Sequence, residues 1–162
     1  MSKATAGDDE GVGLKLDGYL PFRLSIASNA VSRLIARAYE DRFGLTVPQW
    51  RLIAVLAEQP MTQQAIVVRT VMDKVMVSRA AHGLTTRRLV ERSAHEADGR
   101  SHVLSLSDEG RRLYAEVAPL AQAYEAALLT GLTPKEVAQL KRLLLRLEAA
   151  AAKLSGEDRG AP

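Results

Sequence analysis

One helix-start signal recurs four times along the chain, and it restricts the possible folds more than any other feature. Each time an apolar residue precedes an oxygen-bearing side chain, at Thr46, Thr62, Asp73 and Thr133, and apolar residues at helical spacing follow. Such a side chain accepts hydrogen bonds from the first backbone N–H groups of a helix, and the apolar residue packs on the fourth helical residue. At Thr46 and Thr133 a Gln or Glu three residues later completes a capping box. The pattern predicts a mainly helical chain with short connections.

Longer helices are predicted on both sides of these helix starts. Apolar residues recur at steps of three and four from Phe22 to Phe43, which predicts an amphipathic helix ending near Gly44. A second long helix is predicted from Asp108 towards Gly131, with a bend at its internal proline. The long helices flank the shorter central elements, an arrangement that suggests a dimerisation platform presenting a compact central head.

The last predicted helix carries a heptad-like row of apolar residues from Val137 to Leu154. This row either packs on its own domain or forms a subunit interface, and the sequence leaves both possibilities open. Residues 1–13 and 155–162 have no apolar periodicity and are rich in small and polar residues, so we predict two disordered tails. Residues 14–154 are predicted to form a single domain.

The apolar period changes to that of strands between residues 89 and 107. Alternating residues lie on either side of Asp98-Gly99, a pair that tolerates the positive φ of a tight turn. The chain thus has two short helices, starting after Thr62 and Asp73, followed by a two-stranded hairpin. This is the order of a winged helix-turn-helix, in which the second helix enters the major groove of DNA and the hairpin contacts the flanking backbone or minor groove.

Charge and composition agree with this reading. The net charge is +3, and the excess lies in residues 61–112, which hold nine Lys or Arg against six Asp or Glu, whereas residues 1–60 and 113–162 are neutral. A positive central segment indicates where a polyanion would bind. The chain has no cysteine, which excludes disulfides, thiolate metal sites and thiol chemistry. No apolar run is long enough to span a membrane and the N-terminus is polar and acidic, so we expect a soluble, cytoplasmic protein without membrane contact.

Five segments carry a resemblance to a known family: Leu45–Trp50, Met61–Gln64, Asp73–Arg79 with Leu84, Asp98–Ser101 with the residues up to Gly110, and Leu132–Glu136. With them, the sequence from about Leu20 to Leu147 resembles the MarR (multiple antibiotic resistance regulator) family of winged helix-turn-helix regulators. The resemblance implies a mainly α fold with a small two-stranded β wing and a helical dimerisation platform. The head would span about 45–107, and the dimerisation helices about 14–43 and 108–154. The function implied is that of a sequence-specific transcriptional regulator, a repressor acting as a homodimer on a pseudo-palindromic site in double-stranded DNA.

The candidate DNA-binding residues follow from this arrangement. A cationic and polar face of the recognition helix would read bases and phosphates, and the first residues of the preceding helix would bind phosphate through backbone N–H groups. Arg100 at the hairpin tip would enter the minor groove, and Asp98 would orient the wing. Arg87, at the end of the recognition helix, would add a phosphate contact. The candidates are Thr62, Gln63, Gln64, Lys74, Val75, Met76, Ser78, Arg79, His82, Arg87, Asp98, Gly99, Arg100 and Ser101.

Four positions depart from the family pattern, and two of them leave alternatives open. Arg88 stands where the family commonly has glycine, and Val71 stands where a small residue is frequent. Val75 and Met76 replace the small polar residues usual in the recognition helix. These two side chains either contact thymine methyl groups or pack inward.

The resemblance also suggests a small aromatic or phenolic effector held between platform and head, which would change the spacing of the two recognition helices. Candidate ligand residues are Phe22, Ser25, Asn29, Trp50 and Arg51, although core packing is the favoured role of Phe22 and Trp50.

Other functional classes find little support in the sequence. We expect no cofactor, because a zinc site at His95, Glu96 and His102 is disfavoured against plain surface residues. We also expect no enzymatic activity, because Ser78 and His82 lack an evident acid and no catalytic motif occurs. The alternative function is a winged-helix module that binds a protein partner and contacts DNA only incidentally.

Overall fold

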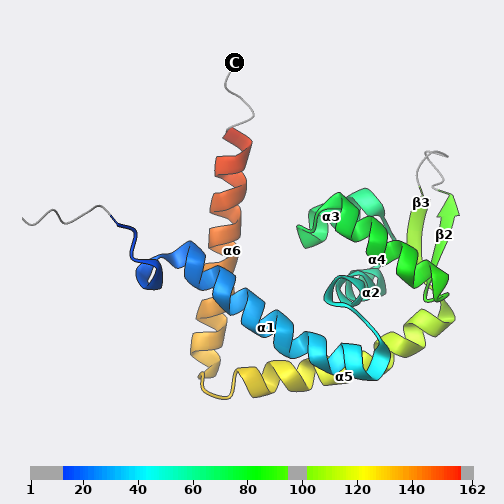
Figure 1. The fold of residues 1–162 in the computed structure, drawn as a ribbon, viewed down its shortest axis with the longest axis horizontal. Helices are drawn as coiled ribbons and strands as arrows, with labels where there is room; N and C mark the ends of the chain where they lie inside the picture. The colour runs from blue at the N-terminus through cyan, green and yellow to red at the C-terminus, as the bar shows by residue number, and fades with distance from the viewer. Residues whose placement is uncertain (1–12, 95–101, 158–162) are drawn as a thin grey trace, which may run out of the picture. The chain divides into compact units, whose positions relative to one another are not determined.

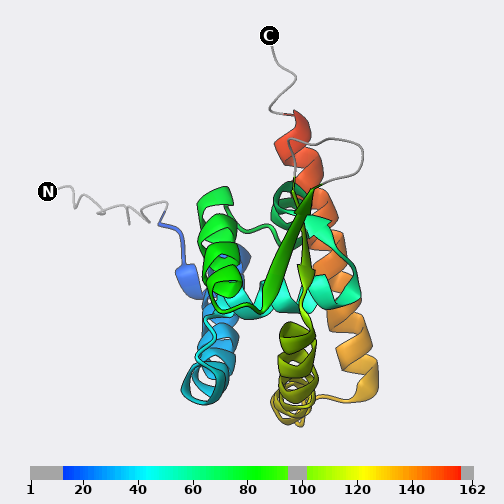
Figure 2. The same ribbon diagram turned by 90° about the vertical axis from the view of Figure 1, so that its right-hand side faces the viewer.

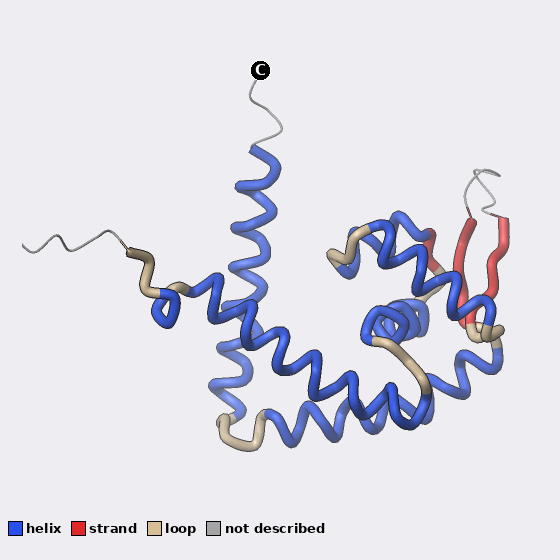
Figure 3. Tube along the Cα trace, viewed as in Figure 1, coloured by secondary structure: helices blue, strands red, loops and turns tan. Residues whose placement is uncertain are grey.

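The computed structural model describes residues 13–94 and 102–157. Helices dominate and a small antiparallel sheet accompanies them, so the predicted fold class is confirmed (Figures 1 and 3). The chain divides into two compact units, one up to Tyr114 and one from Ala115 onwards. The elements are the 3-10 helix η1 (Leu16–Gly18), α1 (Leu20–Phe43), α2 (Val47–Glu58), β1 (Met61–Thr62), α3 (Gln63–Thr70), α4 (Lys74–Thr86), β2 (Val90–Ala94), β3 (His102–Leu106), α5 (Asp108–Leu128) and α6 (Pro134–Glu157).

Three of the predicted helix starts are capped in the first unit. The Thr46 hydroxyl accepts a hydrogen bond from the Gln49 amide at 3.4 Å, and the Gln49 side chain accepts one from the Thr46 amide at 3.0 Å. Thr62 caps α3 through the amide of Ala65, and Asp73 caps α4 through the amide of Met76. These bonds satisfy backbone donors that have no partner inside their own helix, and so each helix begins where the sequence predicted.

The second unit begins its last helix with the predicted capping box. The Glu136 carboxylate accepts hydrogen bonds from the backbone amide and the hydroxyl of Thr133, both at 2.8 Å. Because the backbone bond and then the side-chain bond favour the ionised form, they lower the pKa of Glu136. Helix α6 continues to Glu157, three residues into the segment for which the sequence predicted a tail. Pro119 lies inside α5. None of the described helices is long and apolar enough to cross a lipid bilayer.

The sheet has three strands, in the order β1-β3-β2, and not the two that were predicted. Strand β2 pairs antiparallel with β3 from Val90 opposite Leu106 to Ala94 opposite His102, which confirms the hairpin. The additional strand β1 pairs Met61 with Leu104 on the other edge of β3. A strand of two residues is too short to show an alternating pattern, so β1 was not predicted. Its pairing anchors the N-terminus of α3 to the wing.

The core of the first unit joins the helices to the sheet. Helix α2 lies beneath α3 and α4, and α4 lies beside β2 in both ribbon views (Figures 1 and 2). Trp50 packs against Tyr39, with ring centroids 5.1 Å apart, and stacks on Tyr114 at 5.9 Å. The fully buried aliphatic residues of this unit are Leu45, Leu52, Ile53, Ile66, Val77, Leu84, Val90 and Leu104. This core holds α4 rigidly by one face and leaves its other face to solvent.

Candidate nucleic-acid interface

Helix α4 has a buried face and a polar exposed face. Val77 and Leu84 are completely buried, so they fix the rotation of the helix about its axis. The exposed face carries four of the predicted DNA contacts, all on one helix at compatible spacing. These are Lys74, Ser78, Arg79 and His82.

Val75 and Met76 do not pack inward, which removes one of the two alternatives left by the sequence. Val75 is 59% exposed and Met76 is 40% exposed, whereas the next residue, Val77, is fully buried. Two apolar side chains therefore stand among cationic and polar ones on the solvent side of α4. Such a surface can contact both phosphates and the methyl groups of thymine.

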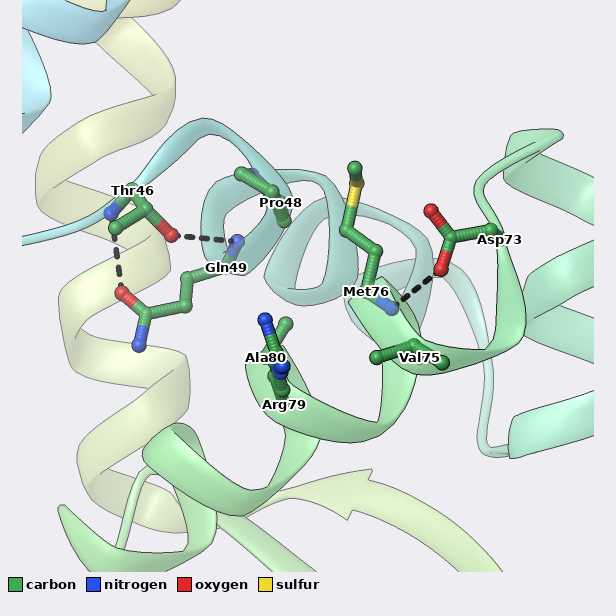
Figure 4. A pocket seen from close by; sticks show the side chains of 8 residues that line it. All are labelled: Thr46, Pro48, Gln49, Asp73, Val75, Met76, Arg79 and Ala80. Atoms are coloured by element: carbon green, nitrogen blue, oxygen red, sulfur yellow. Dashed lines mark hydrogen bonds between the residues drawn. The ribbon is translucent and has the colours of Figure 1, made fainter.

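A surface hollow of about 420 Å³ lies between the exposed side of α4 and the start of α2 (Figure 4). The two helices lie close together here, since the Cβ position of Gly83 on α4 is 2.7 Å from the Gln49 side-chain nitrogen on α2. The hollow was not predicted, since it depends on the packing of two helices distant in sequence. Its lining residues are Thr46, Pro48, Gln49, Asp73, Val75, Met76, Arg79 and Ala80.

The start of α3 presents the predicted phosphate-binding group. The Thr62 hydroxyl accepts a hydrogen bond from the Ala65 amide at 3.1 Å. Gln63 is half-buried and Gln64 is exposed in the first helical turn. The free backbone N–H groups of such a turn carry partial positive charge, which suits an anionic oxygen.

Arg87, predicted as an additional phosphate contact, is already engaged within the protein. Its Nη1 donates a hydrogen bond to the Gly44 carbonyl at 2.9 Å, and its Nη2 donates one to the Phe43 carbonyl at 2.8 Å. The partners lie 43 and 44 residues away in sequence, so no local pattern pointed to this contact.

Two of the four departures from the family pattern occupy left-handed backbone positions. Val71, in the turn between α3 and α4, has φ of 54°, and Arg88, just after α4, has φ of 58°. Glycine adopts this conformation without the steric cost that a Cβ brings, which explains why a small residue or glycine suits both places. The Arg88 carbonyl is further fixed by the Ser107 hydroxyl, which donates a hydrogen bond to it at 2.7 Å.

The tip of the hairpin lies outside the described residues. This applies to the wing candidates Asp98, Gly99, Arg100 and Ser101, and to His95 and Glu96 of the disfavoured zinc site. His102, the third residue of that site, is exposed at the start of β3.

The five predicted ligand residues are divided between α1 and α2. Trp50 is half-buried and packs in an aromatic cluster with Tyr39 and Tyr114. Phe22 is half-buried, whereas Ser25, Asn29 and Arg51 are exposed. None of the five lines the hollow between α2 and α4.

Comparison with known proteins identifies the family. A model described as "MarR family" matches residues 43–101, from the end of α1 through the hairpin. A MarR/EmrR family transcriptional regulator from Acinetobacter sp. ADP1 has the same fold, with a TM-score of 0.81, 26% identity, and coverage of 86% of this chain and 99% of that one. A probable transcriptional regulator from Pseudomonas aeruginosa is 32% identical, with a TM-score of 0.72 and coverage of 82% of this chain and 99% of that one.

One related protein is known by its direction of regulation, as a repressor. An HTH-type transcriptional repressor of Mycobacterium bovis is 29% identical over 135 residues, which cover 80% of this chain and 91% of the relative. The similarity thus extends well beyond the helix-turn-helix. From its fold, its recognition helix and these similarities, the chain belongs to the MarR family of transcriptional regulators.

Proposed function

We propose that the chain is a repressor that binds a pseudo-palindromic operator in double-stranded DNA as a homodimer. The exposed face of α4 is the observation that carries this proposal. An α-helix with side chains is about 10–12 Å in diameter, and the major groove is about 12 Å wide, so α4 fits into it. The relative from Mycobacterium bovis is a repressor, which supports the direction of regulation.

Each candidate residue except Arg87 contacts DNA or shapes the wing in this proposal. Arg79 donates a bidentate pair of hydrogen bonds to guanine, and Lys74 neutralises a phosphate. Ser78 and His82 hydrogen-bond to base edges or phosphates, and Val75 and Met76 contact thymine methyl groups. The N-terminus of α3, with Thr62, Gln63 and Gln64, holds a second phosphate. Arg100 enters the neighbouring minor groove, with Asp98, Gly99 and Ser101 shaping the wing.

The second copy of the chain is proposed to cover the leucines of α6. All described residues of this helix except Val137 are exposed, among them Leu140, Leu143, Leu144 and Leu147 at 37–44%. This row at heptad-like spacing is typical of a helix that packs on a partner helix. A two-fold dimer would present two α4 helices about one DNA turn apart, and the operator would have matching symmetry.

We also propose that a small aromatic or phenolic acid modulates DNA binding. The regulator BpsR of Bordetella bronchiseptica, whose DNA binding is regulated by 6-hydroxynicotinic acid, shares the fold at a TM-score of 0.77 and 23% identity. The candidate ligand residues remain Phe22, Ser25, Asn29, Trp50 and Arg51. Such a ligand regulates only if it binds one spacing of the two heads more tightly than the other.

Selection of bound fragments from a pool of random duplexes tests the function directly. The proposal predicts enrichment of two inverted half-sites with centres about 10 base pairs apart. Affinity for the selected duplex should fall steeply with salt, by a slope of about 0.9 for each phosphate neutralised. Arg79→Ala should reduce the preference for the selected duplex over random DNA. A protein-interaction module would instead yield no enriched sequence and only weak binding to any duplex.

A further inference from the structure

Arg87 joins the ends of two helices that are far apart in sequence. It is the first residue after α4, and its guanidinium donates to the carbonyl oxygens of Phe43 and Gly44, where α1 ends. Both hydrogen bonds are short, at 2.8 and 2.9 Å, and each uses a different nitrogen of the fork. The C-terminal end of the recognition helix is thereby tied directly to the C-terminal end of α1.

The chemistry of both partners favours this link. The last carbonyl groups of a helix have no partner inside it, and they form the negative end of the helix dipole. Gly44 turns the chain through the left-handed conformation at φ of 60°, so α1 stops there while both carbonyl groups remain available to one planar guanidinium. A charged donor makes these bonds stronger than neutral ones, and a forked donor fixes direction as well as distance.

The link spans the path between the recognition helix and the long N-terminal helix. Helix α1 packs on α2, and α2 packs on α4, so packing alone connects α1 to α4 through an intermediate helix. The Arg87 fork adds a direct connection at one end of α4. A shift of α1 against the head would therefore stretch two charged hydrogen bonds or carry the end of α4 with it.

We propose that Arg87 is a positioning residue for DNA recognition, holding the angle of α4 relative to α1 so that base-reading side chains reach the groove. This replaces its predicted role as a phosphate contact. The inference rests on the proposed DNA-binding function for one of its two readouts, and the other readout requires no DNA.

The DNA readout compares two arginine-to-lysine variants of the full chain on the duplex that the wild type selects. A lysine keeps the charge but replaces the planar two-nitrogen fork with a single flexible ammonium group, so Arg87→Lys should weaken binding about tenfold. Arg88→Lys is the matched control, because Arg88 is the exposed neighbour and its side chain has no hydrogen bond among the described residues; its affinity should stay at the wild-type value. Arg87→Ala should weaken binding with an unchanged salt slope.

Two outcomes of this comparison overturn the inference. If Arg87→Lys binds like the wild type and Arg87→Ala lowers the salt slope by about 0.9, Arg87 is a phosphate contact. If both Arg87 variants only lower the melting temperature and the folded protein keeps its affinity, Arg87 is merely structural.

The second readout measures the position of α4 in the free protein. Because the chain has no cysteine, Ser28→Cys on α1 and Ser78→Cys on α4 provide two specific sites for spin labels. The labelled chain is diluted with unlabelled chain, so that only the two labels within one chain are measured. Their distance distribution should have a single narrow peak, and Arg87→Lys should broaden or shift this peak. An unchanged distance distribution would overturn the positioning role even if the wild type bound no duplex. If the wild type binds no duplex but Arg87→Lys still shifts the distance, the result counts against the proposed function alone.

Discussion

Replacing thymine by deoxyuridine in the selected duplex, together with Val75→Ala, tests whether α4 reads methyl groups. More than half of the Val75 side chain is exposed, so it has apolar surface to bury against a base. Each methyl group removed from an apolar contact costs about 0.8 kcal/mol, or about fourfold in affinity. With two copies of α4 on two half-sites, the loss is about 1.6 kcal/mol, or about 15-fold.

The assay is a double-mutant cycle measured by fluorescence anisotropy at one fixed salt concentration. Each thymine position of the half-site is replaced in turn, and the loss is measured with the wild type and with Val75→Ala. At the position read by Val75, the uridine duplex should weaken the wild type but have little further effect on the variant. Val68→Ala is the control, because Val68 is an exposed valine of α3, 71% accessible, with no predicted base contact. Additive losses at every thymine position would refute the reasoning.

Further predictions concern stability. Gly110→Ala should lower the free energy of unfolding by about 2–3 kcal/mol, because a Cβ there would lie 2.0 Å from the Leu89 carbonyl oxygen. Gly131→Ala is the control in thermal unfolding, because a Cβ at Gly131 would have no other atom within 4 Å. Val71→Gly should raise stability by up to about 1 kcal/mol, because it relieves a left-handed valine whose side chain packs little. The pKa of Glu136 is lowered in the folded protein, so its capping bond stabilises α6 at neutral pH, and this contribution is lost as pH falls through that pKa. Between neutral and acidic pH, the melting temperature of Glu136→Gln should therefore change less than that of the wild type. Identical pH profiles would contradict this role.

Local features of the fold were predictable because their causes are local. A cap acts within one helical turn, so Thr46, Thr62 and Asp73 marked the helix starts correctly. The hairpin also followed from alternation on both sides of a turn-forming pair. By contrast, β1 is two residues long, too short for any period to be visible.

The candidate site was only partly predictable because its remaining features depend on tertiary packing. Val75, Met76 and Val77 form a continuous apolar run, and only the rotation of α4 on the core decides which of them faces solvent. Arg87 and Phe43 are brought together by the fold, so charge pattern alone suggested a phosphate contact for Arg87. The hollow beside α4 likewise requires the approach of two separate helices.

The most direct test of the central claim is the mass of the complex with the selected duplex, measured by light scattering after gel filtration at low salt. We predict two chains on one duplex, with the free protein also dimeric. A monomeric protein that leaves the duplex unbound would contradict the account of a dimer reading DNA through α4.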